Sequence, residues 1–132
     1  MTRILALVLV FATACGKDEP DRVVITNRQI AIAEHLLAIY VDLGHKLDHA
    51  TDCKQATEAL VAARTEFEKI AAEAGHLADQ ALANPTLGAW MQQYSTKIGE
   101  TMQYPLQNRT YACHEDEAYM DAVKHLPLVR HK

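Results

Sequence analysis

Three histidines stand where they could bind a metal ion. His45 and His49 are four residues apart, which places both imidazoles on one face of a helix, with two aspartates beside them. His114 lies in an acidic segment later in the chain. Together they are a ligand set that suits zinc or copper. The alternative interpretation is a solvated helix end, where acidic and histidine side chains complement the helix dipole.

Haem is a second cofactor class that the sequence raises. The segment Thr110-Tyr-Ala-Cys113-His114 is similar to the Cys-x-x-Cys-His attachment motif of the four-helix c-prime cytochromes. Thr110 stands where that motif has its first cysteine, so the usual double thioether cannot form. The resemblance implies at most one thioether at Cys113, with His114 as an axial ligand.

The sequence contains none of the common motifs of hydrolases. There is no Gly-x-Ser-x-Gly elbow, no His-Glu-x-x-His pair and no glycine-rich phosphate loop. Aspartates and glutamates are plentiful, but on the surface helices of an acidic domain most are simply solvated. We therefore expect a protein that is not an enzyme and has no cofactor, with zinc, copper or haem binding as the alternative.

The first sixteen residues carry the most specific motif. Arg3 precedes the apolar run 4–11, which is shorter than the roughly 20 residues needed to span a bilayer. The segment Ala12-Thr-Ala-Cys15-Gly16 then resembles the lipobox of bacterial lipoproteins. That resemblance implies cleavage before Cys15, acylation of its sulfur and attachment to a membrane. An ordinary secretory signal followed by a free cysteine is the alternative.

The lipobox also divides the chain. Residues 1–14 are the expected signal peptide, 15–22 a lipidated tether, 23–127 the folded domain and 128–132 a tail. Gly16 occupies the position where an Asp retains lipoproteins of enteric bacteria in the inner membrane. By this analogy we expect attachment to the outer membrane, facing the periplasm.

Composition limits the partners. Removal of residues 1–14 leaves 118 of the 132 residues, which is the size of one domain. It takes away one of 13 basic residues and none of the 17 acidic ones, so the mature chain has a net charge of −5. No basic stripe is present, so we expect no nucleic-acid partner.

Two further cysteines remain after lipidation. An even pair in an exported protein is most simply a disulfide, here between Cys53 and Cys113. Closing a loop of this length stabilises the fold by about 4 kcal/mol in the chain-entropy model. Free thiols or thiolate metal ligands are the alternatives.

Helix signals recur along the whole domain. Abundant alanine, scarce glycine and apolar residues at three-to-four spacing predict an all-α fold. Start and stop signals place four helices at about 26–50, 52–82, 84–104 and 109–125. Gly75 predicts a break or a kink in the second helix. Pro105 and Pro127 predict the ends of the third and fourth.

Four amphipathic helices with short connections predict a small antiparallel four-helix bundle, stapled by the disulfide. This topology places Cys53 and Cys113 at one end, but on diagonally opposite helices, which makes the reach between them long. We expect a membrane-anchored, non-enzymatic lipoprotein that binds another envelope component through a helical face. Trp90, Tyr94 and Tyr104 are candidates for that face. The alternative is a metal- or haem-binding module using His45, His49 and His114.

Overall fold

The computed structural model describes residues 25–127, which form four helices and, within that range, no strand. The elements are α3 (Asn27–His49), α4 (Cys53–Ala83), α5 (Pro85–Ala112) and α6 (Glu117–Lys124). The predicted all-α fold is confirmed. Cys15 and the whole of the expected signal peptide, tether and tail lie outside the described residues.

The starts of the first three helices follow the predicted capping signals. Thr26 and Gln29 exchange side-chain and backbone hydrogen bonds in a capping box. The Asp52 carboxylate accepts a hydrogen bond from the backbone N–H of Gln55 at the start of α4. Asn84 caps α5 ahead of a proline at the first helical position. Local side-chain chemistry therefore sets where these helices begin.

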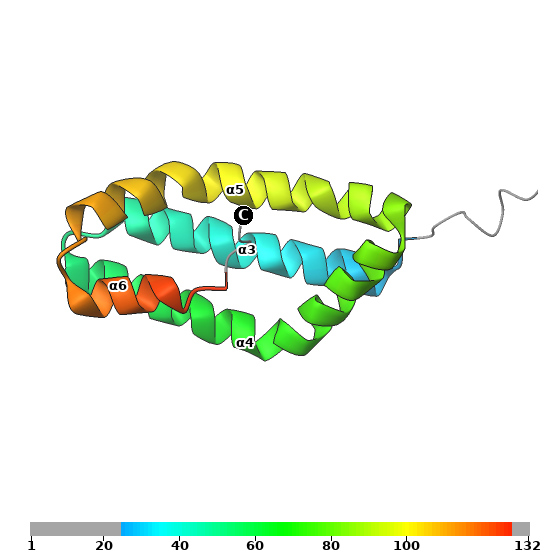
Figure 1. Cartoon of the computed structure of the whole chain (residues 1–132), viewed down its shortest axis with the longest axis horizontal. Helices are drawn as coiled ribbons and strands as arrows, with labels where there is room; N and C mark the ends of the chain where they lie inside the picture. The colour runs from blue at the N-terminus through cyan, green and yellow to red at the C-terminus, as the bar shows by residue number, and fades with distance from the viewer. Residues whose placement is uncertain (1–24, 128–132) are drawn as a thin grey trace, which may run out of the picture.

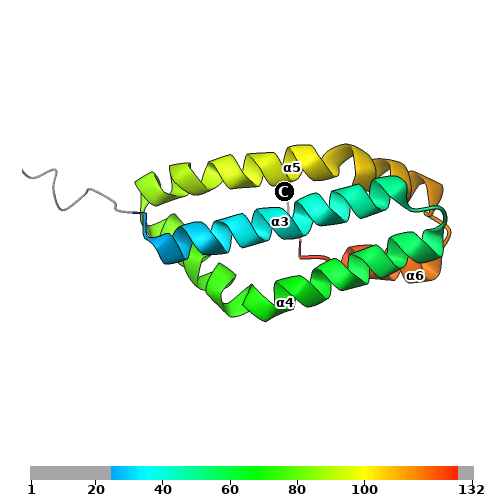
Figure 2. The ribbon, with the colours of Figure 1, turned by 180° about the vertical axis from the view of Figure 1, so that it is seen from behind.

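Gly75 does not break α4, which is helical from Cys53 to Ala83. In both views α4 bends in its second half, toward the start of α5 (Figures 1 and 2). A Cβ atom on Gly75 would meet no other atom within 4 Å. The glycine is thus a tolerated residue on the exposed side of a continuous helix.

The predicted end of the third helix at Pro105 is wrong, because α5 continues through this proline to Ala112. Proline removes the hydrogen bond to the carbonyl of Thr101, four residues earlier. The segment after it is nevertheless held in place, because Leu106 packs against the main core and Cys113 is covalently bonded to α4. Figure 1 shows α5 curving over its last third.

The extension of α5 also changes the fourth helix. The helix predicted at 109–125 is the end of α5 followed by a turn and the eight-residue α6. The structure is therefore three long helices, each antiparallel to the one before it, and one short helix. α3 packs against both α4 and α5, α4 packs against α5, and α6 packs against α4 (Figures 1 and 2).

Two core clusters divide the bundle into halves. In the disulfide half, where α3 and α5 end and α4 begins, twelve buried residues form one cluster that includes Leu47, Leu60 and Tyr119. In the tip half, where α4 is joined to α5, the cluster has three buried residues, Ile32, Leu77 and Leu87. Ile25, the first described residue, packs against this smaller cluster.

Candidate functional site

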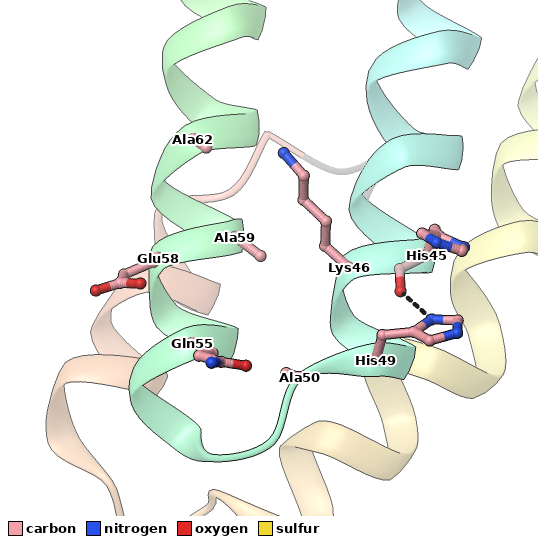
Figure 3. Close-up of a pocket in the computed structure, with 8 residues that line it drawn as sticks. All are labelled: His45, Lys46, His49, Ala50, Gln55, Glu58, Ala59 and Ala62. Carbon is pink, nitrogen blue, oxygen red and sulfur yellow. Dashed lines mark hydrogen bonds between the residues drawn. The ribbon is translucent and has the colours of Figure 1, made fainter.

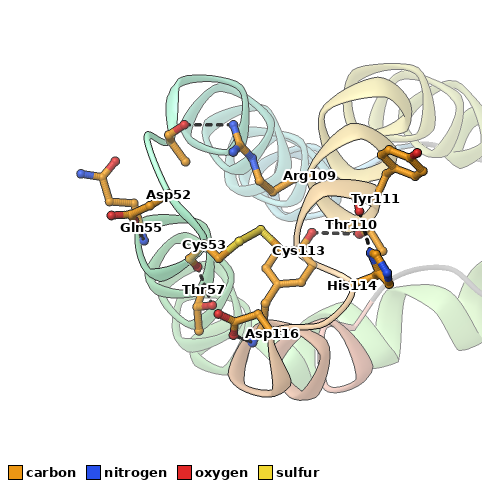
Figure 4. Close-up of a disulfide and its surroundings, with 12 residues drawn as sticks. Asp52, Cys53, Gln55, Thr57, Arg109, Thr110, Tyr111, Cys113, His114 and Asp116 are labelled. Carbon is orange, nitrogen blue, oxygen red and sulfur yellow. Dashed lines mark hydrogen bonds between the residues drawn. A yellow bond between two sulfur atoms is a disulfide. The ribbon is translucent and has the colours of Figure 1, made fainter.

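The predicted disulfide is present and organises one end of the bundle. Cys53 in the first turn of α4 is bonded to Cys113 at the end of α5, with an S–S distance of 2.06 Å and a Cα–Cα distance of 5.8 Å (Figure 4). Because Cys113 ends the third helix and does not begin a fourth, it lies on a neighbour of α4. The long diagonal reach expected from the sequence therefore does not arise.

Arg109 lies one turn before Cys113 and completes the end of α3. Its guanidinium donates hydrogen bonds to the carbonyl of Leu47 at 3.2 and 3.0 Å and to the carbonyl of Ala50 at 3.0 Å. The last carbonyls of a helix have no intrahelical partner, so a cation there satisfies both hydrogen bonding and the dipole. Arg109 thus joins α5 to the end of α3 beside the disulfide.

The turn from α5 to α6 is fixed by polar contacts. The hydroxyls of Thr110 and Tyr119 lie 2.8 Å apart, and the Asp116 carboxylate accepts from the backbone N–H of Tyr119 (Figure 4). Burial raises the pKa of Tyr119, while the hydrogen bond to Thr110 and the charge of Arg109 act in the opposite direction. These contacts give the disulfide region a structural role.

The first histidine pair is brought together as its spacing predicts. The rings of His45 and His49 lie with centroids 4.2 Å apart and are tilted by 33°. Nδ1 of His49 lies 2.9 Å from the carbonyl oxygen of His45, which leaves Nε2 of His49 available (Figure 3). Histidines that bind metals commonly use one ring nitrogen this way and coordinate with the other.

The pair borders an open hollow of about 370 Å³ between α3 and α4. Glu58 lines the same hollow from α4, but Figure 3 shows its carboxylate pointing away from the two rings. The hollow therefore supplies two imidazoles and no converging third ligand from Glu58.

His114 does not join the pair. Its Nδ1 lies 2.9 Å from the carbonyl oxygen of Tyr111, and the side chain is 62% exposed and points away from the disulfide (Figure 4). Among residues 25–127, no three His, Cys, Asp or Glu side chains form a group that could hold a metal. The three-histidine site proposed from the sequence is therefore not assembled.

The haem motif does not fit the structure either. The sulfur of Cys113, which the motif would use for a thioether, is bonded to Cys53. Cys113 is also only 1% exposed. The residues that resembled an attachment site thus serve the bundle as a covalent cross-link.

The three aromatic candidates for a partner surface lie in different settings. Trp90 packs against the small core of the tip half and contacts Tyr94, with ring centroids 5.0 Å apart. The Tyr94 hydroxyl donates to Glu34 at 3.0 Å; burial, with this hydrogen bond and the negative charge, raises the tyrosine's pKa. Tyr104 is 67% exposed, and Tyr111, two helical turns further along α5, is 83% exposed.

Sequence reasoning missed two of the contacts that shape this molecule. One is the set of hydrogen bonds from Arg109 to the end of α3. The other is the buried Tyr40, whose hydroxyl donates to the carbonyl of Pro127 at 2.5 Å and holds the end of the described chain against α3. A basic residue before the last cysteine and a tyrosine on an apolar stripe were the available signals, but neither identifies a partner.

No family model, curated protein or solved structure matches this chain. None of the helices among residues 25–127 combines the length and apolar character needed to cross a bilayer. The residues themselves are therefore the basis for assigning a function.

Proposed function

We propose that this protein is a bacterial envelope lipoprotein, anchored through acyl chains on Cys15 and acting as a non-enzymatic interaction module. The observation that carries the proposal is the lipobox-like segment Ala12-Thr-Ala-Cys15-Gly16 after a short apolar run. Two or three acyl chains hold a protein firmly at a membrane, because each buried methylene adds about 0.8 kcal/mol. Gly16 favours the outer membrane, with the bundle in the periplasm.

The anchor is tested by the intact mass of the protein from a bacterial envelope. We expect loss of residues 1–14 and the added mass of acyl chains, and we expect Cys15→Ser to leave an unprocessed, unacylated chain. An unmodified Cys15 in the wild-type protein would contradict the anchor. The same measurement without reductant reports the Cys53–Cys113 bridge as a deficit of two hydrogens.

The interaction surface that we propose lies on α5 in the disulfide half. Tyr104 and Tyr111 are separated by two helical turns, share one side of α5 and are strongly exposed. Exposed tyrosines are typical of protein interfaces because they combine apolar area with a hydroxyl.

A photoreactive amino acid at position 104 or 111 tests this surface in the native envelope. We expect one discrete adduct from either site and none from Val61, an apolar residue on α4 that is 51% exposed. The same adduct from Val61, or no adduct from α5, would contradict the surface.

A second candidate function is binding of zinc or copper by His45 and His49. It is favoured by the ring separation of 4.2 Å and by the contact of Nδ1 of His49 with a backbone carbonyl. Equilibrium dialysis with each metal should show one site that His45→Gln or His49→Gln removes. His125→Gln is the matched control, because Nδ1 of His125 also contacts a carbonyl four residues earlier. Equal loss in the control would reject the pair.

A further inference from the structure

The connection between α4 and α5 lies in the longest segment of the chain that lacks Asp, Glu, Lys and Arg. This segment, residues 80–96, has 17 residues and is flanked by Asp79 and Lys97. It contains the last turn of α4, the cap at Asn84 and the first three turns of α5. We call it the hairpin tip. A mature chain with a net charge of −5 thus has an uncharged segment at this end, and the adjacent Arg28 of α3 is ion-paired with Glu73.

The hairpin tip exposes apolar side chains in a rigid frame. Leu82 is 87% exposed, and Ala83, Pro85 and Ala89 are exposed as well. α4 and α5 approach so closely here that a Cβ atom on Gly88 would lie 3.0 Å from the carbonyl oxygen of Ala81. The tip is therefore a fixed structure, in which exposure of Leu82 is built into the hairpin.

Trp90 lies in the second turn of α5, next to these residues in the sequence. It is half-buried against the cluster of Ile32, Leu77 and Leu87 and contacts the ring of Tyr94. Tryptophan and tyrosine favour the interface between membrane and water, where an apolar ring and a polar group are both satisfied. An uncharged hairpin with an exposed leucine and a nearby aromatic pair has the composition of a shallow membrane contact.

The described part of the chain also begins at this end of the bundle. Figures 1 and 2 show the start of α3 beside the connection of α4 and α5, and the side chains of Gln29 and Gln80 are hydrogen-bonded at 3.2 Å. Nine residues separate Cys15 from Ile25, which is a reach of at most about 35 Å. The disulfide end of α3 lies a further ~33 Å away along the helix.

We propose that the hairpin tip contacts the surface of the lipid bilayer, inserting Leu82 among the headgroups. This inference rests on the proposed anchor at Cys15, which keeps the tip at high effective concentration near the membrane. The sides of the bundle carry charged side chains such as Asp42, Glu58 and Glu66, which would lose hydration at a membrane surface. The hairpin tip can approach without desolvating a charged side chain of its own.

Trp90 is the one tryptophan in the sequence and serves as the reporter. The acylated protein is placed in vesicles of phosphatidylethanolamine and phosphatidylglycerol, with or without a phosphatidylcholine that carries a nitroxide on its headgroup. We expect quenching of Trp90 that falls at least about threefold in Leu82→Asp, because insertion of an apolar side chain is lost. Val61→Asp is the matched control, with an exposed apolar residue of α4 in the disulfide half, and should quench like the wild type.

Three outcomes decide the inference. Equal quenching in the wild type and Leu82→Asp overturns it, as does an absence of quenching. If Trp90 is not quenched and Leu82→Asp instead abolishes a cross-link from position 83 to an envelope protein, the tip is a protein-binding surface. If the mass shows an unmodified Cys15, the proposed anchor is wrong, but the proposed contact of the hairpin tip is still to be tested. The chain is then coupled through that thiol to a maleimide lipid, and the same comparison of variants still supports or overturns tip contact.

Discussion

The two halves of the bundle share α3, α4 and α5 but are held together differently, and α6 belongs to the disulfide half alone. The disulfide half has a cluster of twelve buried residues, a covalent bond between α4 and α5, and Arg109 bound to the end of α3. The tip half has three buried residues. Its link between α3 and α4 includes the solvent-exposed ion pair of Arg28 and Glu73, and exposed pairs contribute about 0 to 1 kcal/mol. Local stability follows buried area and cross-links, so it is concentrated away from the proposed anchor.

This difference has a functional meaning in the proposed arrangement. The tip half is nearest the proposed tether and presents the uncharged hairpin tip to the membrane, while the disulfide half presents Tyr104 and Tyr111 at the far end. A rigid far end loses less conformational entropy when it binds a partner.

Removal of the disulfide should have the largest effect on the stability of the protein and on the difference in stability between its two halves. In the double variant Cys53→Ala/Cys113→Ala, we expect the free energy of unfolding to fall by about 4 kcal/mol, because the unfolded chain regains the freedom of a 60-residue loop. Urea denaturation measures the change, and amide hydrogen exchange should show the halves becoming more alike. Identical denaturation midpoints with and without the bridge would contradict this account.

Leucine truncation should distinguish the two cores. Leu47→Ala in the disulfide half should cost about 3 kcal/mol, and Leu87→Ala in the tip half about 2 kcal/mol, because a cavity in the smaller core collapses more easily. Leu82→Ala is the control and should change stability by less than about 0.5 kcal/mol, since this side chain is 87% exposed. A larger cost for Leu87→Ala would reverse the ranking of the halves.

Alkaline pH should weaken the disulfide half through Tyr40. Burial raises the pKa of Tyr40 from 10.0 to about 12, so the folded protein retains a proton that the unfolded chain releases. The stability that comes from this raised pKa is fully present below pH 10 and is lost as the pH rises toward 12.

Tyr40→Phe should cost about 1 kcal/mol at neutral pH through the lost hydrogen bond to Pro127, and should flatten the alkaline decline. Denaturation at a series of pH values measures both effects. Tyr111→Phe, at an exposed tyrosine, is the control and should leave the pH profile unchanged.

The smallest expected effects come from two glycines near the tip. Gly75→Ala should raise the free energy of unfolding by up to about 1 kcal/mol, because alanine favours the helix and its Cβ meets nothing within 4 Å. Gly88→Ala should lower it, since its Cβ would lie 3.0 Å from the carbonyl oxygen of Ala81. Thermal denaturation separates the two signs. A destabilising Gly75→Ala would show that α4 needs flexibility at its bend.

Helix starts were predictable from sequence because capping is local. Thr26, Asp52 and Asn84 satisfy backbone N–H groups within three residues of themselves, so the signal and its structure occupy the same short window. The end of α5 was not predictable by the same means. Pro105 is a strong local stop signal, but Leu106 and Cys113 make contacts with distant residues that outweigh one lost hydrogen bond.

By itself, the sequence determined the helical class, three of the helix starts, the pairing of Cys53 with Cys113 and the closeness of His45 to His49. Each of these depends on residues a few positions apart, or on there being two cysteines left to pair. Only the tertiary structure decided that Cys113 lies on a neighbour of α4, that His114 points away, and that residues 80–96 form an exposed end beside the start of α3. Those features depend on how long helices pack side by side, and packing is set by contacts between residues far apart in the chain.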